Sequence, residues 1–179
     1  KIITSTAMFY DLNDPNKAVQ DIKKLLAKDG ILGIQVSYLY DTIRDMNFYD
    51  FCHEHLEYYS LKTIMYLMNK NGMEVFDAKR VPTREGSIEV SAGWKGKHSI
   101  SPNVKKLLKA EVDAGLFDPK QWIKYRKRVE KQKDKFLELV AKVKREGKTL
   151  VADSCPTRGV VLLNYYGLDL PYVSQLPGT

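Results

Sequence analysis

Two of the three histidines in this 179-residue chain flank a glutamate in the segment Cys52-His-Glu-His-Leu-Glu-Tyr-Tyr-Ser-Leu61. Imidazole, carboxylate and phenol groups lie together there, and their ordinary pKa values run from acidic to strongly basic. Proton-transfer sites are built from such groups. Apolar residues before and within the segment indicate that part of it is buried, where pKa values can shift. We therefore interpret the segment as a catalytic or substrate-contacting loop.

Two other interpretations of this segment stay open. The His53-x-His55 pair is compatible with a metal site, but zinc takes three or four ligands and no further histidine or cysteine lies nearby. A structural polar loop, whose histidines satisfy backbone groups, is the second alternative. An extended conformation would place both histidines on one side and Glu54 on the other, whereas a helical turn would spread the three apart.

The composition is that of an ordinary globular protein, with 44% hydrophobic and 28% charged residues. No run approaches the roughly 20 apolar residues of a membrane span. The first residues lack the layout of a secretory signal. The two cysteines are far apart in the sequence and fit a reducing compartment, so we expect a cytoplasmic protein.

The net charge of +7 is concentrated in one part of the chain. Residues 104–148 hold 15 lysines and arginines against 7 acids. Such a block attracts nucleic acid or a membrane surface, or it forms the solvated face of a helix. Acids are interleaved with the bases, and aromatic residues are not spaced as a single-strand binder needs. We therefore expect neither nucleic acid nor a membrane as a partner.

The predicted elements alternate between strand and helix, which indicates an α/β fold. We expect a strand at 1–7, a helix from Asp14-Pro15 to Gly30 and a second strand at 31–37, which together form a parallel crossover. Ligands of such sheets bind at the carboxyl ends of the strands. The histidine segment follows the second strand closely, so it is expected at that edge.

The remaining chain continues this alternation. Arg84 and Glu85 are expected at the tip of a strand pair, and His98 is expected on the surface of a linker. Arg158 is expected in a loop of small residues before a helix, and such a loop can bind a phosphate. An apolar seam along the long helix, together with an exposed sheet edge, favours association into a homo-oligomer. The elements are a helix at 60–72, strands at 73–81 and 87–94, a linker at 95–102, helices ending near Gly115 and Gly147, a strand at 148–152, a helix at 160–166 and a strand at 170–173.

Four motifs resemble those of the class I S-adenosylmethionine-dependent C-methyltransferases that act on nucleotide-linked deoxysugars. The resemblance covers nearly the whole chain, and its first motif is the most distinctive. The motifs are Cys52-His-Glu-His-Leu-Glu-Tyr-Tyr-Ser-Leu61, Arg84-Glu-Gly-Ser-Ile88, Gly147-Lys-Thr with Arg158-Gly and Leu162-Leu-Asn-Tyr165, and the terminal Pro177-Gly-Thr179.

The resemblance implies a domain layout. The family has a zinc-binding head, a methyltransferase core and a Rossmann-like carboxyl-terminal domain that engages the sugar nucleotide. Residues 1–94 are then expected to be the C-terminal half of a Rossmann-like class I core, 95–147 a helical linker, and 148–179 part of a second Rossmann-like domain. The glycine-rich strand-turn that holds the cofactor in this family is not found in the chain, so the S-adenosylmethionine site is expected to be incomplete here.

The resemblance also implies roles for particular residues. The reaction is methylation of a carbon next to a ketone, in which a base removes a ring proton and a donor stabilises the enolate oxygen. His55 matches the family's base and Glu54 its acidic companion. The substrate contacts implied are His53, Tyr58, Arg84, Ser154, Arg158 and Asn164, and the cofactor contacts are Met8 and Phe9.

Some positions depart from the family pattern. Cys52 stands where many members have the tyrosine credited with stabilising the enolate, so Tyr58 or Tyr59 is expected to take that role. Phe9-Tyr10-Asp11 stands where many members carry a histidine. Two rival functions stay open: a methyltransferase with another acceptor, such as an oxygen atom, and a non-catalytic module that binds nucleotides or assembles with other subunits.

Overall fold

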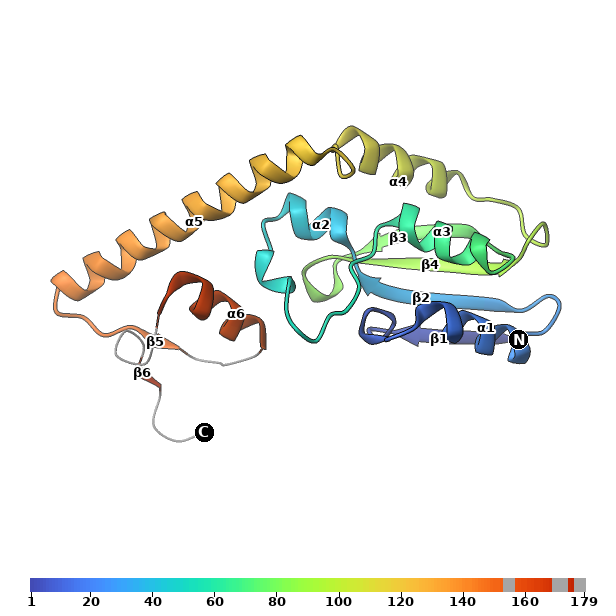
Figure 1. The fold of residues 1–179 in the computed structure, drawn as a ribbon, viewed down its shortest axis with the longest axis horizontal. Coiled ribbons are helices and arrows are strands. Elements are labelled where there is room, and N and C mark those ends of the chain that lie inside the picture. The colour runs from blue at the N-terminus through green and yellow to red at the C-terminus, as the bar shows by residue number, and fades with distance from the viewer. Residues whose placement is uncertain (153–156, 169–173, 176–179) are drawn as a thin grey trace.

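The computed structural model describes residues 1–152, 157–168 and 174–175, and it shows a mixed α/β protein (Figure 1). A four-stranded sheet has the order β1-β2-β4-β3. Strands β1 and β2 are parallel, whereas β4 is antiparallel to both of its neighbours. The α/β expectation is confirmed. The strands are β1 (Ile2–Thr6), β2 (Ile31–Ser37), β3 (Met73–Val81) and β4 (Ser87–Trp94).

Helix α1 (Pro15–Leu25) connects β1 to β2, as the sequence predicts for a parallel crossover. The Asp14 side chain caps its first turn by accepting a hydrogen bond from the backbone N–H of Lys17 at 2.9 Å. The predicted end at Gly30 is wrong, because the helix stops at Leu25. The next residue, Leu26, has an extended backbone (φ −77°, ψ 127°) and its side chain is buried in the core.

Strands β3 and β4 form the predicted antiparallel pair, and the short 3₁₀ helix η3 (Thr83–Glu85) is its tip. Helix α3 (Leu61–Lys70) precedes the pair and begins at a capping box formed by Ser60 and Thr63. Helices α3 and α4 (Pro102–Asp113) pack against β3. His98, expected on the surface, is half-buried and stacks on Phe76 with 4.3 Å between ring centroids, so that expectation is wrong.

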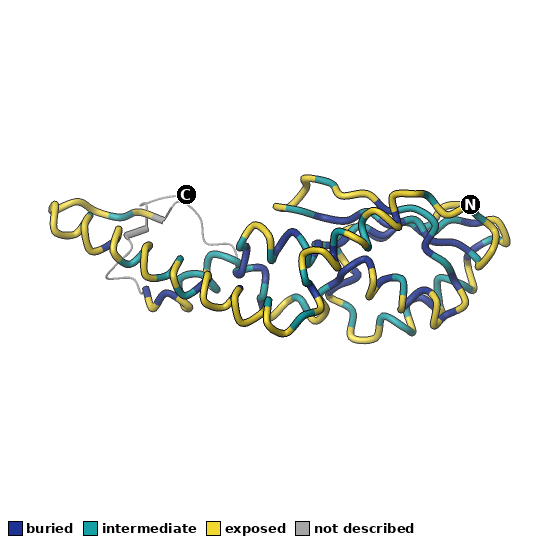
Figure 2. The backbone as a smooth tube through the Cα atoms, turned by 90° about the horizontal axis from the view of Figure 1, so that it is seen from above, coloured by how far each residue is buried: buried dark blue, intermediate teal, exposed yellow. Residues whose placement is uncertain are grey.

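Most fully buried side chains belong to one sheet core. It is formed by alternate residues of the central strands and by the inner faces of α1, α3 and α4, and Figure 2 shows this concentration of burial. Its largest fully buried members include Phe9, Leu32, Tyr38, Leu61, Ile64, Met68, Met73 and Ile88.

Helix α5 (Pro119–Arg145) projects beyond the sheet. Helix α6 (Thr157–Tyr166) lies below α5 in the view of Figure 1. The two helices and the 3₁₀ helix η2 (Phe48–Asp50) enclose a second, smaller apolar cluster, which we call the arm cluster. The sequence left open whether the seam of the long helix packs against another element or another chain, and part of it packs against elements of this chain. The buried members of the arm cluster are Phe48, Tyr125, Val129, Val140, Tyr166 and Leu168.

Some connections differ from the prediction. The sequence pattern missed helix α2 (Leu39–Arg44) and the 3₁₀ helices η1 (Phe9–Asp11) and η2. Strand β5 (Val151–Ala152) is shorter than predicted and pairs in parallel with β6 (Ser174–Gln175). The strand expected at 170–173 lies outside the described residues. Among the helices of the described ranges, none has the length and apolarity that crossing a membrane requires.

Candidate active site

The histidine segment is fixed across the carboxyl ends of β1 and β2, where an α/β sheet binds its ligands. On the β1 side, the Tyr10 carbonyl accepts hydrogen bonds from the backbone N–H groups of Leu56 (2.8 Å) and Glu57 (3.1 Å). On the β2 side, the Leu39 N–H donates to the Tyr59 carbonyl at 2.9 Å, next to a bridge between Tyr38 and Tyr59. The backbone therefore fixes the second half of the segment against both strand ends.

His55 is half-buried at this edge of the sheet and packs on Tyr10. Their ring centroids are 4.2 Å apart, whereas the Tyr58 ring is 6.3 Å from the imidazole. The backbone N–H of His55 donates to the Cys52 carbonyl at 3.2 Å, so the start of the loop is a hydrogen-bonded turn and not an extended segment. The imidazole thus lies beside a phenol at the rim of the sheet.

The tip of the β3–β4 pair places a cation over this phenol. Arg84 donates from Nη1 to the Tyr10 hydroxyl at 3.5 Å. Arg84 (φ 51°) and Glu85 (φ 65°) are both left-handed, a conformation that is uncommon for residues with side chains. At Gly86 a Cβ atom would lie 2.5 Å from the Cβ of Asp41, so only glycine fits. The turn has a tightly specified shape that projects Arg84 toward the site.

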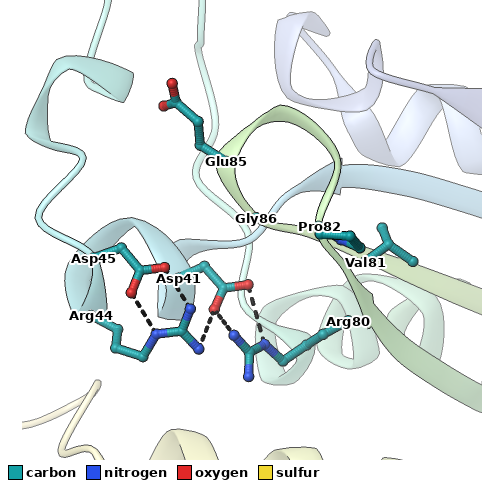
Figure 3. A pocket seen from close by; sticks show the side chains of 8 residues that line it. All are labelled: Asp41, Arg44, Asp45, Arg80, Val81, Pro82, Glu85 and Gly86. Atoms are coloured by element: carbon teal, nitrogen blue, oxygen red, sulfur yellow. Dashed lines mark hydrogen bonds and ion pairs between the residues drawn. The ribbon is translucent and has the colours of Figure 1, made fainter.

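An ion-pair cluster supports this turn from the side of α2 (Figure 3). The buried carboxylate of Asp41 pairs with Arg80 and, at 3.1 Å, with Arg44, which also pairs with Asp45. The cluster lines a cavity of about 410 Å³ that Glu85 and Gly86 close on one side. Because its charges neutralise one another, we assign the cluster to positioning of the turn.

The first turn of α6 meets the same edge. Arg158 approaches Asp50 with Nε 2.9 Å from Oδ1, and Glu85 with Nη1 3.4 Å from Oε2. The Asp50 contact is an ion pair that lacks hydrogen-bond alignment. Burial raises the pKa of Asp50, and the Arg158 guanidinium opposes that shift. The neighbouring Thr157 donates from Oγ1 to the Glu54 carboxylate at 3.1 Å. Helix α6 therefore contacts the histidine loop directly.

The structure brings five of the sequence-predicted residues together at this edge: Glu54, His55, Tyr58, Arg84 and Arg158. Glu54 bonds Thr157, and no described contact joins its carboxylate to the His55 ring, so the orienting role expected from the resemblance stays a prediction. Tyr58 donates from its hydroxyl to the Cys52 carbonyl at 3.2 Å.

The other predicted residues are placed differently. His53 and Asn164 are exposed, the latter on α6, and Ser154 lies outside the described residues. Met8, at the carboxyl end of β1, is 44% exposed. Phe9 is 1% exposed, and its ring packs edge-on against Tyr59 inside the sheet core.

Sequence reasoning missed Tyr10 and Asp50 as members of this site. Tyr10 lies at the predicted carboxyl end of the first strand, so its position was a usable signal. Asp50 is an isolated acid in the run Phe48-Tyr-Asp-Phe51, a context in which a carboxylate needs a partner when buried. No local pattern identifies that partner, because Arg158 is more than a hundred residues away.

The described residues contribute at most one wall of a site for S-adenosylmethionine. Met8 is accessible at the carboxyl end of β1, but Phe9 belongs to the core. A second cavity, of about 490 Å³, lies between α2 and the start of α5. Neither this cavity nor that of Figure 3 is lined by Met8, Phe9 or His55. These residues alone do not fit the whole cofactor.

Comparison with known proteins supports a specific relationship. The chain is 28% identical over 169 residues to the C-methyltransferase NovU of Streptomyces niveus, an alignment that covers 94% of this chain and 40% of that protein. The chain thus spans less than half the length of this curated relative. The family model described as "C-methyltransferase C-terminal domain" matches residues 82–176, more than half of the chain. The chain therefore belongs to the C-methyltransferase C-terminal domain family.

Proposed function

We propose that this chain is part of an S-adenosylmethionine-dependent C-methyltransferase whose substrate is a nucleotide-linked deoxysugar with a ketone. The observation that carries the proposal is the placement of the His55 imidazole at the ligand-binding edge of the sheet, against the Tyr10 ring and close to Arg84 and Arg158. A base beside hydrogen-bond donors is what removal of a proton next to a carbonyl requires.

The neutral imidazole of His55 is the base in this proposal. It takes the proton from the carbon next to the ketone, and the electron pair of the broken C–H bond moves into the carbonyl to give an enolate. Donors at the site stabilise the negative charge on the enolate oxygen. When bound, S-adenosylmethionine supplies the electrophilic methyl group that the enolate carbon accepts. The half-buried position of His55 limits access of water to the ring while leaving one side open.

Arg158 is the proposed contact for the diphosphate of the sugar nucleotide. Its guanidinium suits a phosphate because it can donate two parallel hydrogen bonds. In the structure it pairs with the buried Asp50 and the exposed Glu85. A bound diphosphate would replace the exposed Glu85 contact and leave the Asp50 pair in place, which would hold the guanidinium in position.

The experiment uses the full-length protein encoded by the gene that contains this chain. We would supply methyl-labelled (carbon-13) S-adenosylmethionine with a 4-keto deoxysugar nucleotide and locate the label by NMR. We expect a new carbon–carbon bond, and about a 100-fold or greater loss of rate in His55→Gln.

Label on an oxygen atom would overturn carbon as the acceptor and support the rival methyltransferase. Calorimetric binding of the nucleotide without any turnover would overturn the enzymatic proposal in favour of a binding module.

A further inference from the structure

The proposed reaction needs a hydrogen-bond donor close to the base. The enolate oxygen is bonded to the carbon adjacent to the one that loses its proton, so a donor within a few ångströms of the imidazole is required. Cys52, at the start of the histidine loop, is buried, and a thiol is a weak donor. Arg84 donates to Tyr10, and Arg158 pairs with Asp50 and Glu85. The neutral donors that remain near His55 are the phenols of Tyr10, Tyr58 and Tyr59.

Two of these phenols each lack one of the two properties that the donor needs, which are a free proton and a position against the base. The Tyr58 hydroxyl donates its proton to the Cys52 carbonyl at 3.2 Å, and its ring packs on Phe51. The Tyr59 hydroxyl has no described hydrogen-bond partner, but its ring packs against Phe9 and no described contact joins it to His55. Neither phenol has both a free proton and a position against the base.

Tyr10 has both. Its ring is the nearest aromatic contact of His55, at 4.2 Å. Its hydroxyl oxygen accepts a hydrogen bond from Arg84, and among the described residues nothing accepts the hydroxyl proton. A phenol has one proton to donate besides its acceptor sites, so this proton remains for a bound oxygen atom.

The Arg84 guanidinium and the burial of Tyr10 both favour the phenol as a hydrogen-bond donor. The guanidinium polarises the O–H bond by bonding to the oxygen, and burial raises the pKa of Tyr10 above its ordinary value, so the proton stays on the oxygen at neutral pH. The backbone of the same residue holds the histidine loop through Leu56 and Glu57. The base and the donor are thus fixed by one short segment.

We propose that the Tyr10 hydroxyl is a catalytic residue that donates a hydrogen bond to the enolate oxygen, and that Arg84 strengthens this bond. This inference rests on the proposed function. In the step, the C–H bond breaks, its proton moves to His55, and the electron pair ends on the carbonyl oxygen. Tyr10 keeps its proton and shares it with that oxygen in a hydrogen bond. Tyr10 is 4% exposed, so the enolate oxygen reaches its hydroxyl through a shift of the exposed Arg84 side chain that keeps the guanidinium hydrogen-bonded to the phenol oxygen.

The experiment measures exchange of the ring proton with solvent deuterium in the full-length protein, with a 4-keto deoxysugar nucleotide and no methyl donor. Tyr10→Phe keeps the ring that packs on His55 and removes only the hydroxyl. We expect the rate constant of exchange to fall about 100-fold, with the nucleotide dissociation constant changed less than about 3-fold, as for loss of one oxyanion donor. Tyr125→Phe is the matched control, since it removes the hydroxyl of another buried tyrosine, which has no described hydrogen-bond partner, and should leave exchange unchanged.

Two further variants keep the proposal falsifiable. Arg84→Met and Tyr58→Phe should each slow exchange less than Tyr10→Phe does. Exchange at the wild-type rate in a folded Tyr10→Phe protein, or a large loss confined to Tyr58→Phe, would overturn the role of Tyr10. Absence of exchange in the wild-type protein would instead overturn the proposed function, so the two failures are distinguishable.

Discussion

The sheet core and the arm cluster achieve stability in different ways. The sheet core fills the space between four strands and three helices with many apolar side chains that are almost completely buried. The arm cluster is a small group of aromatic and aliphatic contacts between α5, α6 and η2, and the outer turns of α5 are exposed (Figure 2). We infer that the sheet region is stable without the arm, whereas the stability of the arm depends on a few specific contacts.

Buried carboxylates show the same contrast. Glu111, on α4, is completely buried and accepts hydrogen bonds from the Leu61 N–H (2.5 Å), the Lys62 N–H (3.3 Å) and the Tyr38 hydroxyl (2.9 Å). Asp50, at the border of the arm, has Thr42 and the ion pair with Arg158. The first carboxylate is held by the sheet region alone, but the second relies on a side chain from α6.

The candidate active site lies on the border between these two regions. His55 and Tyr10 belong to the edge of the sheet, whereas Thr157 and Arg158 belong to the arm. A change in the docking of α6 therefore alters the site without disturbing the sheet core. Substitutions in each region test whether the stability of the sheet is independent of the arm.

The largest effect is expected in the sheet region. Glu111→Leu removes the acceptor of three hydrogen bonds and leaves the Tyr38 hydroxyl and the start of α3 unsatisfied, which should lower the free energy of unfolding by about 3 kcal/mol. Urea unfolding followed by circular dichroism measures this change. A Glu111→Leu protein as stable as the wild type would show that the carboxylate is not needed.

The same carboxylate predicts a pH dependence. Burial raises the pKa of Glu111 in the folded protein, so the folded state binds the proton more tightly than the unfolded state. The free energy of unfolding should therefore decrease as the pH rises from the ordinary glutamate pKa to the raised pKa of the folded protein. Above the raised pKa, the contribution of Glu111 should be constant. Glu111→Gln, which cannot ionise, should flatten this part of the profile.

A smaller and local effect is expected in the arm. Arg158→Met leaves the Asp50 carboxylate buried without its cation, and since Arg158 is 25% exposed we expect a cost of about 2 kcal/mol. Hydrogen exchange should show faster opening of α6 with unchanged protection in β2 and β4. Arg126→Met is the matched control: it removes an exposed pair with Glu130 at 2.8 Å, which should cost less than about 0.5 kcal/mol. Equal loss of protection in the sheet would contradict the separation of the two regions.

The sequence predicts the sheet region better than the site. Hydrophobic periodicity and capping residues such as Asp14 and Ser60 act locally, so the strands of the crossover, the starts of α1 and α3 and the β3–β4 pair were predicted with nearly correct bounds. The short helices α2 and η2 were missed because their conformation is set by tertiary contacts, such as the pair of Asp41 with Arg80 and the ring contact of Phe48 with Tyr166.

The histidine loop was predicted as part of the site from its residue types and from the resemblance. The residues that contact it were predicted only in part. Its position at the carboxyl ends of the strands follows from topology. The contacts of Tyr10 with Arg84, and of Asp50 with Arg158, join segments 74 and 108 residues apart, and no local spacing encodes them. The structure was needed to bring these groups together.

The most direct measurement of the central claim is proton exchange in three versions of the full-length protein. With a 4-keto deoxysugar nucleotide in deuterated water, the wild type should incorporate deuterium next to the ketone. His55→Gln should lose this exchange by about 100-fold or more. His98→Gln, which changes the histidine that stacks on Phe76 in the sheet region, should keep it. Wild-type exchange in a folded His55→Gln protein would contradict the assignment of the base.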